Sequence, residues 1–242
     1  MEFTYDAYRS LLKLLKQRKY EFASFNNYKI VHKPVILRHD IDNSLVKALK
    51  IAKIENECNV KSTYFVLLST DFYNIFSKRS NEILKEIISL GHNFGLHFDE
   101  KRYNINSEEV LKKYVEYEKR ILEGVLDRSI STVSMHRPSK WILENNIQFN
   151  TIINTYSAEF LQNFKYLSDS RMHWREDVIS IINRGKYDKL HILTHPFWYA
   201  QDKGDIKSRV ERYINQAKKE RYSQLKDNIR YLEDVLRIEE VQ

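Results

Sequence analysis

At residues 35–42 the chain reads Val35-Ile36-Leu37-Arg38-His39-Asp40-Ile41-Asp42, an apolar run that ends in two carboxylates. The run is short, partly β-branched and bracketed by Pro34 and Asn43, so it predicts a buried strand over residues 34–42. Because side chains alternate along a strand, Asp40 and Asp42 face the same side at its C-terminal end. Capping of the next helix by Asn43 would explain only one polar residue here. Two adjacent like charges indicate instead a metal site or an acid/base pair.

Strands alternate with helices over most of the chain. Further strands are predicted at residues 62–68, 93–97, 131–135, 150–156, 165–168 and 189–195, and helices at 4–19, 45–56, 82–90, 107–122 and 175–184. Such alternation predicts an α/β fold with a parallel sheet and helices outside it, and about seven units indicate closure into a seven- or eight-stranded (β/α) barrel with an N-terminal helix.

A long C-terminal helical extension is expected over residues 204–242, within a single domain of residues 1–242. Its apolar stripe consists of Ile206, Val210, Tyr213, Ile214, Ala217, Leu225, Ile229, Leu232 and Leu236. A helix packed across the barrel, which we favour, and the surface of a homodimer both explain such a stripe.

Polar side chains gather where the predicted strands end. They are Asp40, Asp42, His97, His136, Arg137, Asp169 and His195. In parallel barrels the chemistry lies at the C-terminal ends of the strands, so this rim is the candidate site. His92 falls on the other face of its strand by alternation and is expected to be structural.

Composition narrows the classes of protein. The 242 residues carry a net charge of +7, and Cys58 is the only cysteine. The chain shows no signal-peptide core and no apolar stretch long enough to span a membrane, so we expect a cytoplasmic protein. The lysines are scattered over helix faces, which favours an anionic small molecule over a nucleic acid as partner.

From Pro34 to Trp198 the segments resemble the polysaccharide deacetylase (NodB-homology) family, carbohydrate esterase family four. The resemblance implies a distorted (β/α) barrel that removes acetyl groups from sugars with one divalent metal, zinc by preference and manganese or cobalt as alternatives. Arg38-His39-Asp40-Ile41-Asp42 resembles the first motif of the family, which makes Asp40 the general base and Asp42 a metal ligand.

The second motif is similar to Gly91-His92-Asn93-Phe94-Gly95-Leu96-His97, which makes His97 a ligand. The family places a further histidine four residues later, where this chain has Lys101, and an ammonium group cannot ligate a metal. His136, which we favour, and Asp99 are the candidate replacements.

The remaining motifs imply the acid/base machinery. Met135-His136-Arg137-Pro138 resembles the third motif, in which Arg137 would pair with and orient Asp40. The segment 166–174 resembles the fourth, in which Asp169 would brace that arginine, and 190–196 resembles the fifth, which ends in the general acid His195. Three aromatic side chains are candidates for contact with a sugar ring: Trp141, Trp174 and Trp198.

Taken together, the residues and the resemblance predict a metal-dependent deacetylase acting on the N-acetyl group of an amino sugar. An intracellular precursor of a surface polysaccharide, carried on a nucleotide or a lipid, suits the charge. The alternatives are another C–N hydrolase on the same barrel with an altered or absent metal site, and a non-catalytic sugar-binding protein.

Overall fold

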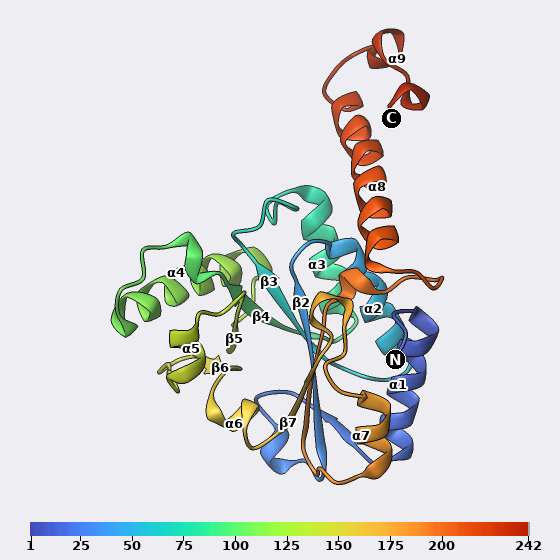
Figure 1. The fold of residues 1–242 in the computed structure, drawn as a ribbon. Coiled ribbons are helices and arrows are strands. Elements are labelled where there is room, and N and C mark those ends of the chain that lie inside the picture. Colours follow the sequence, from blue (N-terminus) through green and yellow to red (C-terminus); the bar gives the residue numbers. More distant parts are fainter. Residues whose placement is uncertain (242) are drawn as a thin grey trace. The chain divides into compact units, whose positions relative to one another are not determined.

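The structure, a computed structural model, describes residues 1–241, so Gln242 of the predicted domain lies outside the described residues. The chain divides into two compact units, Met1–Gln201 and Asp202–Gln242. All the strands and the candidate site belong to the first unit (Figure 1).

The first unit is built on a parallel sheet in the strand order β6-β5-β4-β3-β2-β8-β7, with β1 paired to the beginning of β2. The strands are β1 Glu21–Ala23, β2 Pro34–Ile41, β3 Thr63–Leu67, β4 Asn93–Phe98, β5 Thr132–Met135, β6 Ile153–Asn154, β7 Lys165–Ser168 and β8 Leu190–Thr194. Within the described residues β6 and β7 pair with one neighbour each, so the barrel stays open between them. The predicted fold, a distorted parallel (β/α) barrel, is confirmed.

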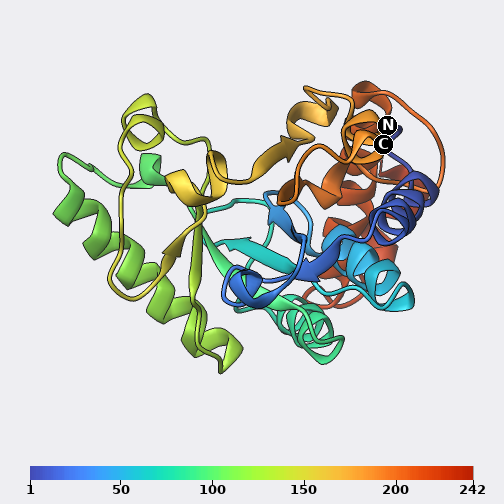
Figure 2. The ribbon, with the colours of Figure 1, turned by 90° about the horizontal axis from the view of Figure 1, so that it is seen from below.

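Helices cover the outside of the sheet. They are α1 Tyr5–Gln17, α2 Leu45–Glu57, α3 Lys78–Ser89, α4 Glu108–Leu126, α5 Lys140–Glu144, α6 Ala158–Leu161 and α7 Val178–Arg184. Seen from below, α1 to α4 follow one another along the outer side of the strands (Figure 2). Polar caps set where the larger ones begin: the hydroxyls of Thr4, Ser44, Ser77 and Ser107 each accept a backbone N–H from the first turn.

The two faces of the sheet bury separate clusters of apolar side chains. Val35, Leu37 and Tyr64 belong to the large cluster under the helices. Ile36 and Phe65 belong to a smaller cluster inside the barrel. Gly95 makes room for this inner cluster, because a Cβ atom there would overlap a ring carbon of Phe65. The strand predicted from residues 35–42 is therefore buried on both faces, and its alternate side chains enter two different clusters.

Several boundaries differ from the prediction. The strand expected at 150–156 is reduced to Ile153–Asn154, because the Asn154 side chain accepts the N–H of Tyr156 at 3.0 Å and turns the chain away. The short elements β1, α5 and α6 were not predicted, since three to five residues carry too little periodicity to recognise.

The second unit contains α8 Ile206–Lys226 and α9 Leu232–Val235. The predicted single helix through Leu236 is wrong: α8 ends at Lys226, and Tyr231 adopts a left-handed φ of 61°, which interrupts the helix. Tyr222 ties the two helices together by donating its hydroxyl to the carbonyl of Leu236 at 2.7 Å. Within the apolar stripe, Ile206, Val210 and Ile214 remain 38–50% exposed.

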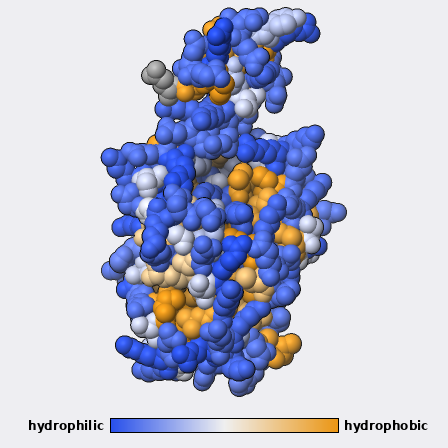
Figure 3. All heavy atoms as spheres, turned by 90° about the vertical axis from the view of Figure 1, so that its right-hand side faces the viewer, coloured by the Kyte–Doolittle hydropathy of each residue, from blue (hydrophilic) through white to orange (hydrophobic). Residues whose placement is uncertain are grey.

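The face of the molecule shown in Figure 3 is mainly hydrophilic, with apolar patches between the charged side chains. None of the helices in the described part of the chain is long and apolar enough to cross a membrane.

Candidate active site

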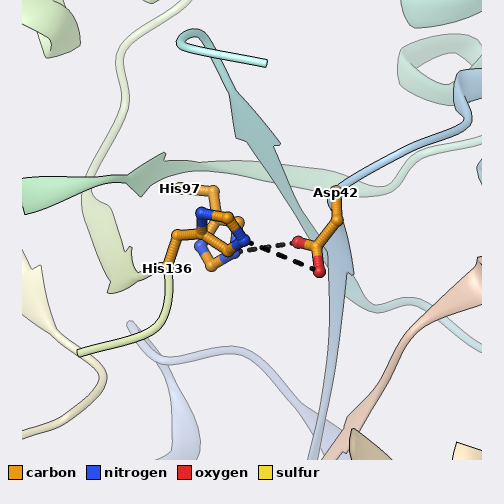
Figure 4. A group of neighbouring side chains, drawn as sticks. All are labelled: Asp42, His97 and His136. Carbon is orange, nitrogen blue, oxygen red and sulfur yellow. Dashed lines mark ion pairs between the residues drawn. The ribbon is translucent and has the colours of Figure 1, made fainter. Parts of the chain in front are cut away.

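Three side chains from the C-terminal ends of strands in the same sheet converge on one point (Figure 4). Asp42 follows β2, His97 is on β4, and His136 follows β5. His97 Nε2 lies 3.1 Å from Asp42 Oδ1, and His136 Nε2 lies 4.0 Å from Asp42 Oδ2. The three candidate ligand atoms all lie within 4.8 Å of one another. A carboxylate and two imidazole nitrogens thus face a common centre.

The other nitrogen of each ring is held from behind. His97 Nδ1 lies 2.6 Å from the hydroxyl of Ser134, and His136 Nδ1 lies 3.1 Å from Asp99 Oδ2. In metal sites such outer partners fix the tautomer and aim the free nitrogen at the ion. Both rings therefore present Nε2 to Asp42, and Asp99 lies behind His136 instead of joining the three ligands.

These residues fit a divalent metal. Asp42 Oδ1 is buried and, among the described residues, is paired only with His97 Nε2 at 3.1 Å, so it keeps lone pairs open toward the common centre. Burial alone would raise the pKa of Asp42, but the hydrogen bond from His97 and the charges of His97, His195 and His136 hold that pKa well below its ordinary value. Burial lowers the pKa of His136, which keeps the ring neutral and able to ligate. Mixed nitrogen and oxygen donors suit zinc, manganese or cobalt.

Asp40 lies beside this centre and is paired with Arg38 from its own strand. The guanidinium donates from Nε to Oδ1 at 2.8 Å and from Nη2 to Oδ2 at 2.7 Å, and the Arg38 side chain is fully buried. The remaining contacts of Asp40 are with Ser134, 3.5 Å from Oδ1, and with His97, 3.6 Å from Oδ2. Burial alone would raise the pKa of Asp40, but Arg38 holds it below its ordinary value.

The predicted pairing of Arg137 with Asp40 is wrong. Arg137 donates to Asp99 Oδ2 at 3.0 Å, and its side chain is 61% exposed. Its left-handed φ of 48° takes the chain out of the direction of β5 directly after His136. The alternation that aligned Asp40 with Asp42 also places Arg38 on that face, two residues earlier, and this signal was missed.

The prediction that Asp169 braces Arg137 is wrong. Asp169 pairs instead with His195. Its Oδ1 lies 2.6 Å from His195 Nδ1, and the same carboxylate accepts the backbone N–H of His195 at 3.0 and 3.1 Å. Burial alone would lower the pKa of His195, but the bond to Asp169 outweighs it and raises the pKa to about 9. Because Nδ1 is engaged, Nε2 is the nitrogen that can give up a proton.

The three tryptophans differ in exposure. Trp174 is 8% exposed within the large apolar cluster, so its faces are closed to a sugar ring and the predicted contact is wrong for this residue. Trp198 is partly buried against the same cluster. Trp141, on α5, is 39% exposed and retains a face that a ligand can reach.

No family model matches the chain, and neither does any curated protein. Similar solved structures include a family 4 carbohydrate esterase from Bacillus anthracis, at 14% identity and a TM-score of 0.44 over 76% of this chain and 75% of that chain. A family 4 pseudoenzyme from the same organism matches at 14% identity and a TM-score of 0.45, over 76% and 61% of the two chains.

The deacetylase PplD from Streptococcus pyogenes, in complex with acetate, matches at 15% identity and a TM-score of 0.45 over 78% of this chain and 80% of that chain. This chain spans 57% of the length of a mutant of the pseudoenzyme. Identity is low throughout, and the chemistry proposed below rests on this chain's own residues.

Proposed function

We propose that the protein is a metal-dependent deacetylase that hydrolyses the N-acetyl group of an amino sugar. The observation that carries this proposal is the convergence of Asp42, His97 and His136 on one centre, next to a carboxylate held by an arginine. The motif resemblance adds to this geometry, because it assigns a ligand or proton-transfer role to four of the residues found at the rim.

Asp42, His97 and His136 would hold the metal. When bound, a divalent metal polarises the acetyl carbonyl and lowers the pKa of the attacking water. Arg38 keeps Asp40 ionised and oriented, so that this carboxylate can take the proton from water as it adds to the carbonyl carbon. His195, held by Asp169, donates its Nε2 proton to the sugar nitrogen as the C–N bond breaks. The products are acetate and a free amino sugar.

The substrate class is proposed more finely from charge. A net charge of +7 favours a sugar that carries phosphate, as nucleotide-linked and lipid-linked precursors of surface polysaccharides do inside the cell. Trp141 is the aromatic side chain that we propose for contact with the sugar ring, because it is the most exposed of the three tryptophans.

The test is acetate release from a panel of N-acetylated free, nucleotide-linked and lipid-linked sugars, with protein that is metal-loaded or stripped by a chelator. We expect release only from the loaded protein. Release that persists without metal would favour a C–N hydrolase of another kind. Sugar binding without release would favour the non-catalytic alternative, and either result would overturn the proposal.

As the alternative to packing of the α8 stripe across the barrel, we propose a homodimer through this stripe, which includes Ile206, Val210 and Ile214. Light scattering of the wild type and of a variant with Ile206→Ser and Ile214→Ser tests this. A monomeric wild type would contradict it.

A further inference from the structure

A second carboxylate, Glu55 of α2, is buried on the outer side of the sheet and is fully occupied by donors. Its side chain has no exposed surface. Oε1 accepts from Tyr8 at 2.6 Å and lies 2.8 Å from His39 Nε2. Oε2 accepts from Ser62 and Tyr64, both at 2.6 Å. Each oxygen therefore has two partners within the chain.

The ring of His39 connects this carboxylate to strand β8. Its Nε2 faces Glu55, and its Nδ1 lies 2.6 Å from the hydroxyl of Thr194. His39 and Thr194 are 0% and 1% exposed. With both nitrogens engaged, the ring cannot rotate without losing two hydrogen bonds in a dry environment, where an unpaired polar group is costly.

The position of this link in the sheet gives it significance. His39 and Thr194 form the last register pair between β2 and β8. Asp40 on β2 and His195 directly after β8 are the next residues of the chain, and by alternation they face the opposite side. The side-chain link thus fastens the two strands at the point where backbone pairing stops and the proposed base and acid begin.

We propose that Glu55, His39 and Thr194 are positioning residues, which hold Asp40 and His195 at the separation that hydrolysis needs. This inference rests on the proposed function, because it assumes that these two side chains transfer protons in one reaction. Apolar side chains would suffice to pack α2 against the sheet. A hydrogen-bonded ring adds a defined spacing between two strand ends, since its bonds are directional.

The experiment compares two hydroxyl deletions in the same network. Thr194→Val removes the link to β8 with little change in shape, and Thr194→Ser keeps the hydroxyl. Ser62→Ala is the matched control, because it removes a hydroxyl from the same carboxylate on the side of β3. The measurements are kcat and KM for acetate release, bound metal, and the midpoint of thermal unfolding.

We expect Thr194→Val to lower kcat by on the order of tenfold with KM unchanged, less than the about 10²-fold that a 1 Å misplacement can cost. Thr194→Ser should restore kcat. Ser62→Ala should leave kcat unchanged while lowering the unfolding midpoint as much as Thr194→Val does. Thr194→Ala takes the place of Thr194→Val if the latter does not fold. If kcat is the same in Ser62→Ala as in the Thr194 variant that lacks the hydroxyl, whether lowered or unchanged in both, the inference is overturned.

A second readout needs no substrate. The proton between His195 Nδ1 and Asp169 should give a downfield NMR signal, because the two atoms are 2.6 Å apart. Thr194→Val should shift or broaden this signal and Ser62→Ala should not. An unchanged signal in both would overturn the positioning role even in a protein that releases no acetate. If the wild type releases no acetate but Thr194→Val still changes the signal, only the proposed function would be contradicted.

Discussion

Two clusters in the barrel unit contain the same groups, one carboxylate and two histidines, but differ in how the carboxylate is satisfied. They are Glu55 with His39 and His92 behind the sheet, and Asp42 with His97 and His136 at the strand ends. Both oxygens of Glu55 have two hydrogen-bonding partners each. Asp42 Oδ1 is buried and, among the described residues, is paired only with an imidazole nitrogen, His97 Nε2 at 3.1 Å.

The difference separates a structural cluster from a candidate metal site. A buried carboxylate whose lone pairs are all used by the chain stabilises the fold and has no room for a ligand. A buried carboxylate oxygen paired only with an imidazole nitrogen keeps lone pairs that a metal can use. Residue composition alone would not distinguish the two clusters; hydrogen-bond saturation does.

The largest effect should follow from changing the open carboxylate. Asp42→Asn should abolish stoichiometric metal binding, measured by elemental analysis, and reduce acetate release to the level of chelated protein, because a neutral amide lacks the negative charge with which the carboxylate attracts a divalent cation. The unfolding midpoint should change little, since the amide oxygen of asparagine can still accept from His97 Nε2, the group that lies 3.1 Å from Oδ1. Full metal occupancy in this variant would erase the distinction between the clusters.

The base beside the metal centre should come next. Asp40→Asn should lower kcat by about 10²–10⁴-fold, the usual contribution of positioned proton transfer. Bound metal should remain stoichiometric, because Asp40 is engaged by Arg38 and not by the ligand centre. Wild-type turnover in this variant would rule out Asp40 as the base.

Changing Glu55, the carboxylate whose oxygens are fully hydrogen-bonded, should affect stability and not metal binding. Glu55→Gln should destabilise the fold by about 3–5 kcal/mol, the cost of breaking a buried ion pair, and leave metal binding intact. Burial alone would raise the pKa of Glu55, but His39 lowers it to about 2. The stability due to this carboxylate is therefore present above its ordinary value of 4.5 and lost as the pH falls toward 2.

Denaturant unfolding between pH 5 and about 2 measures this slope, which Glu55→Gln should largely remove. Loss of metal from Glu55→Gln at neutral pH, in protein that is still folded, would show that the two clusters are not independent.

A smaller effect is expected from the group behind the ligand His136. Asp99→Asn should weaken metal binding by about 10–100-fold, as is typical when a partner of a ligating histidine is lost. Glu100→Gln is the matched control, because Glu100 is the next residue and bonds Ser139 instead of a ligand. Competition with a coloured chelator measures both. Equal affinities would mean that Asp99 does not orient the ring.

Most of the fold and part of the site could be predicted from residues 35–42 and from the strands that follow. The two-residue spacing of Asp40 and Asp42 placed them together, and strand ends placed His97 and His136 near them. The partner of Asp40 was missed, although the same spacing places Arg38 on that face. The resemblance pointed instead to Arg137, which the left-handed turn after His136 directs elsewhere.

Glu55 could not have been recognised from sequence. It lies on a helix with many charged residues, where a glutamate is usually solvated. Only the tertiary structure shows that it is buried among donors from α1, β2 and β3. The pairing of Asp99 with His136 likewise depends on β4 and β5 being neighbours, which sheet order decides and local pattern does not.

The smallest effect at neutral pH concerns His195. One ring nitrogen of His195 is held by the chain, whereas both ring nitrogens of His39 are. Asp169 raises the pKa of His195 against the effect of burial, to about 9 from an ordinary 6.5. As general acid, His195 must be protonated, so kcat/KM should be constant near neutrality and fall as the pH rises through about 9. Asp169→Asn should move this alkaline limb toward 6.5, because the main group that opposes burial is then lost while Asp42 and Asp40 still raise the pKa of the ring. Protonation alone then predicts a loss of about fourfold at pH 7 and about thirtyfold at pH 8. A pH profile of kcat/KM for the wild type and Asp169→Asn, with Asp177→Asn as an exposed control, measures the shift. An alkaline limb that does not move would show that His195 is not the general acid.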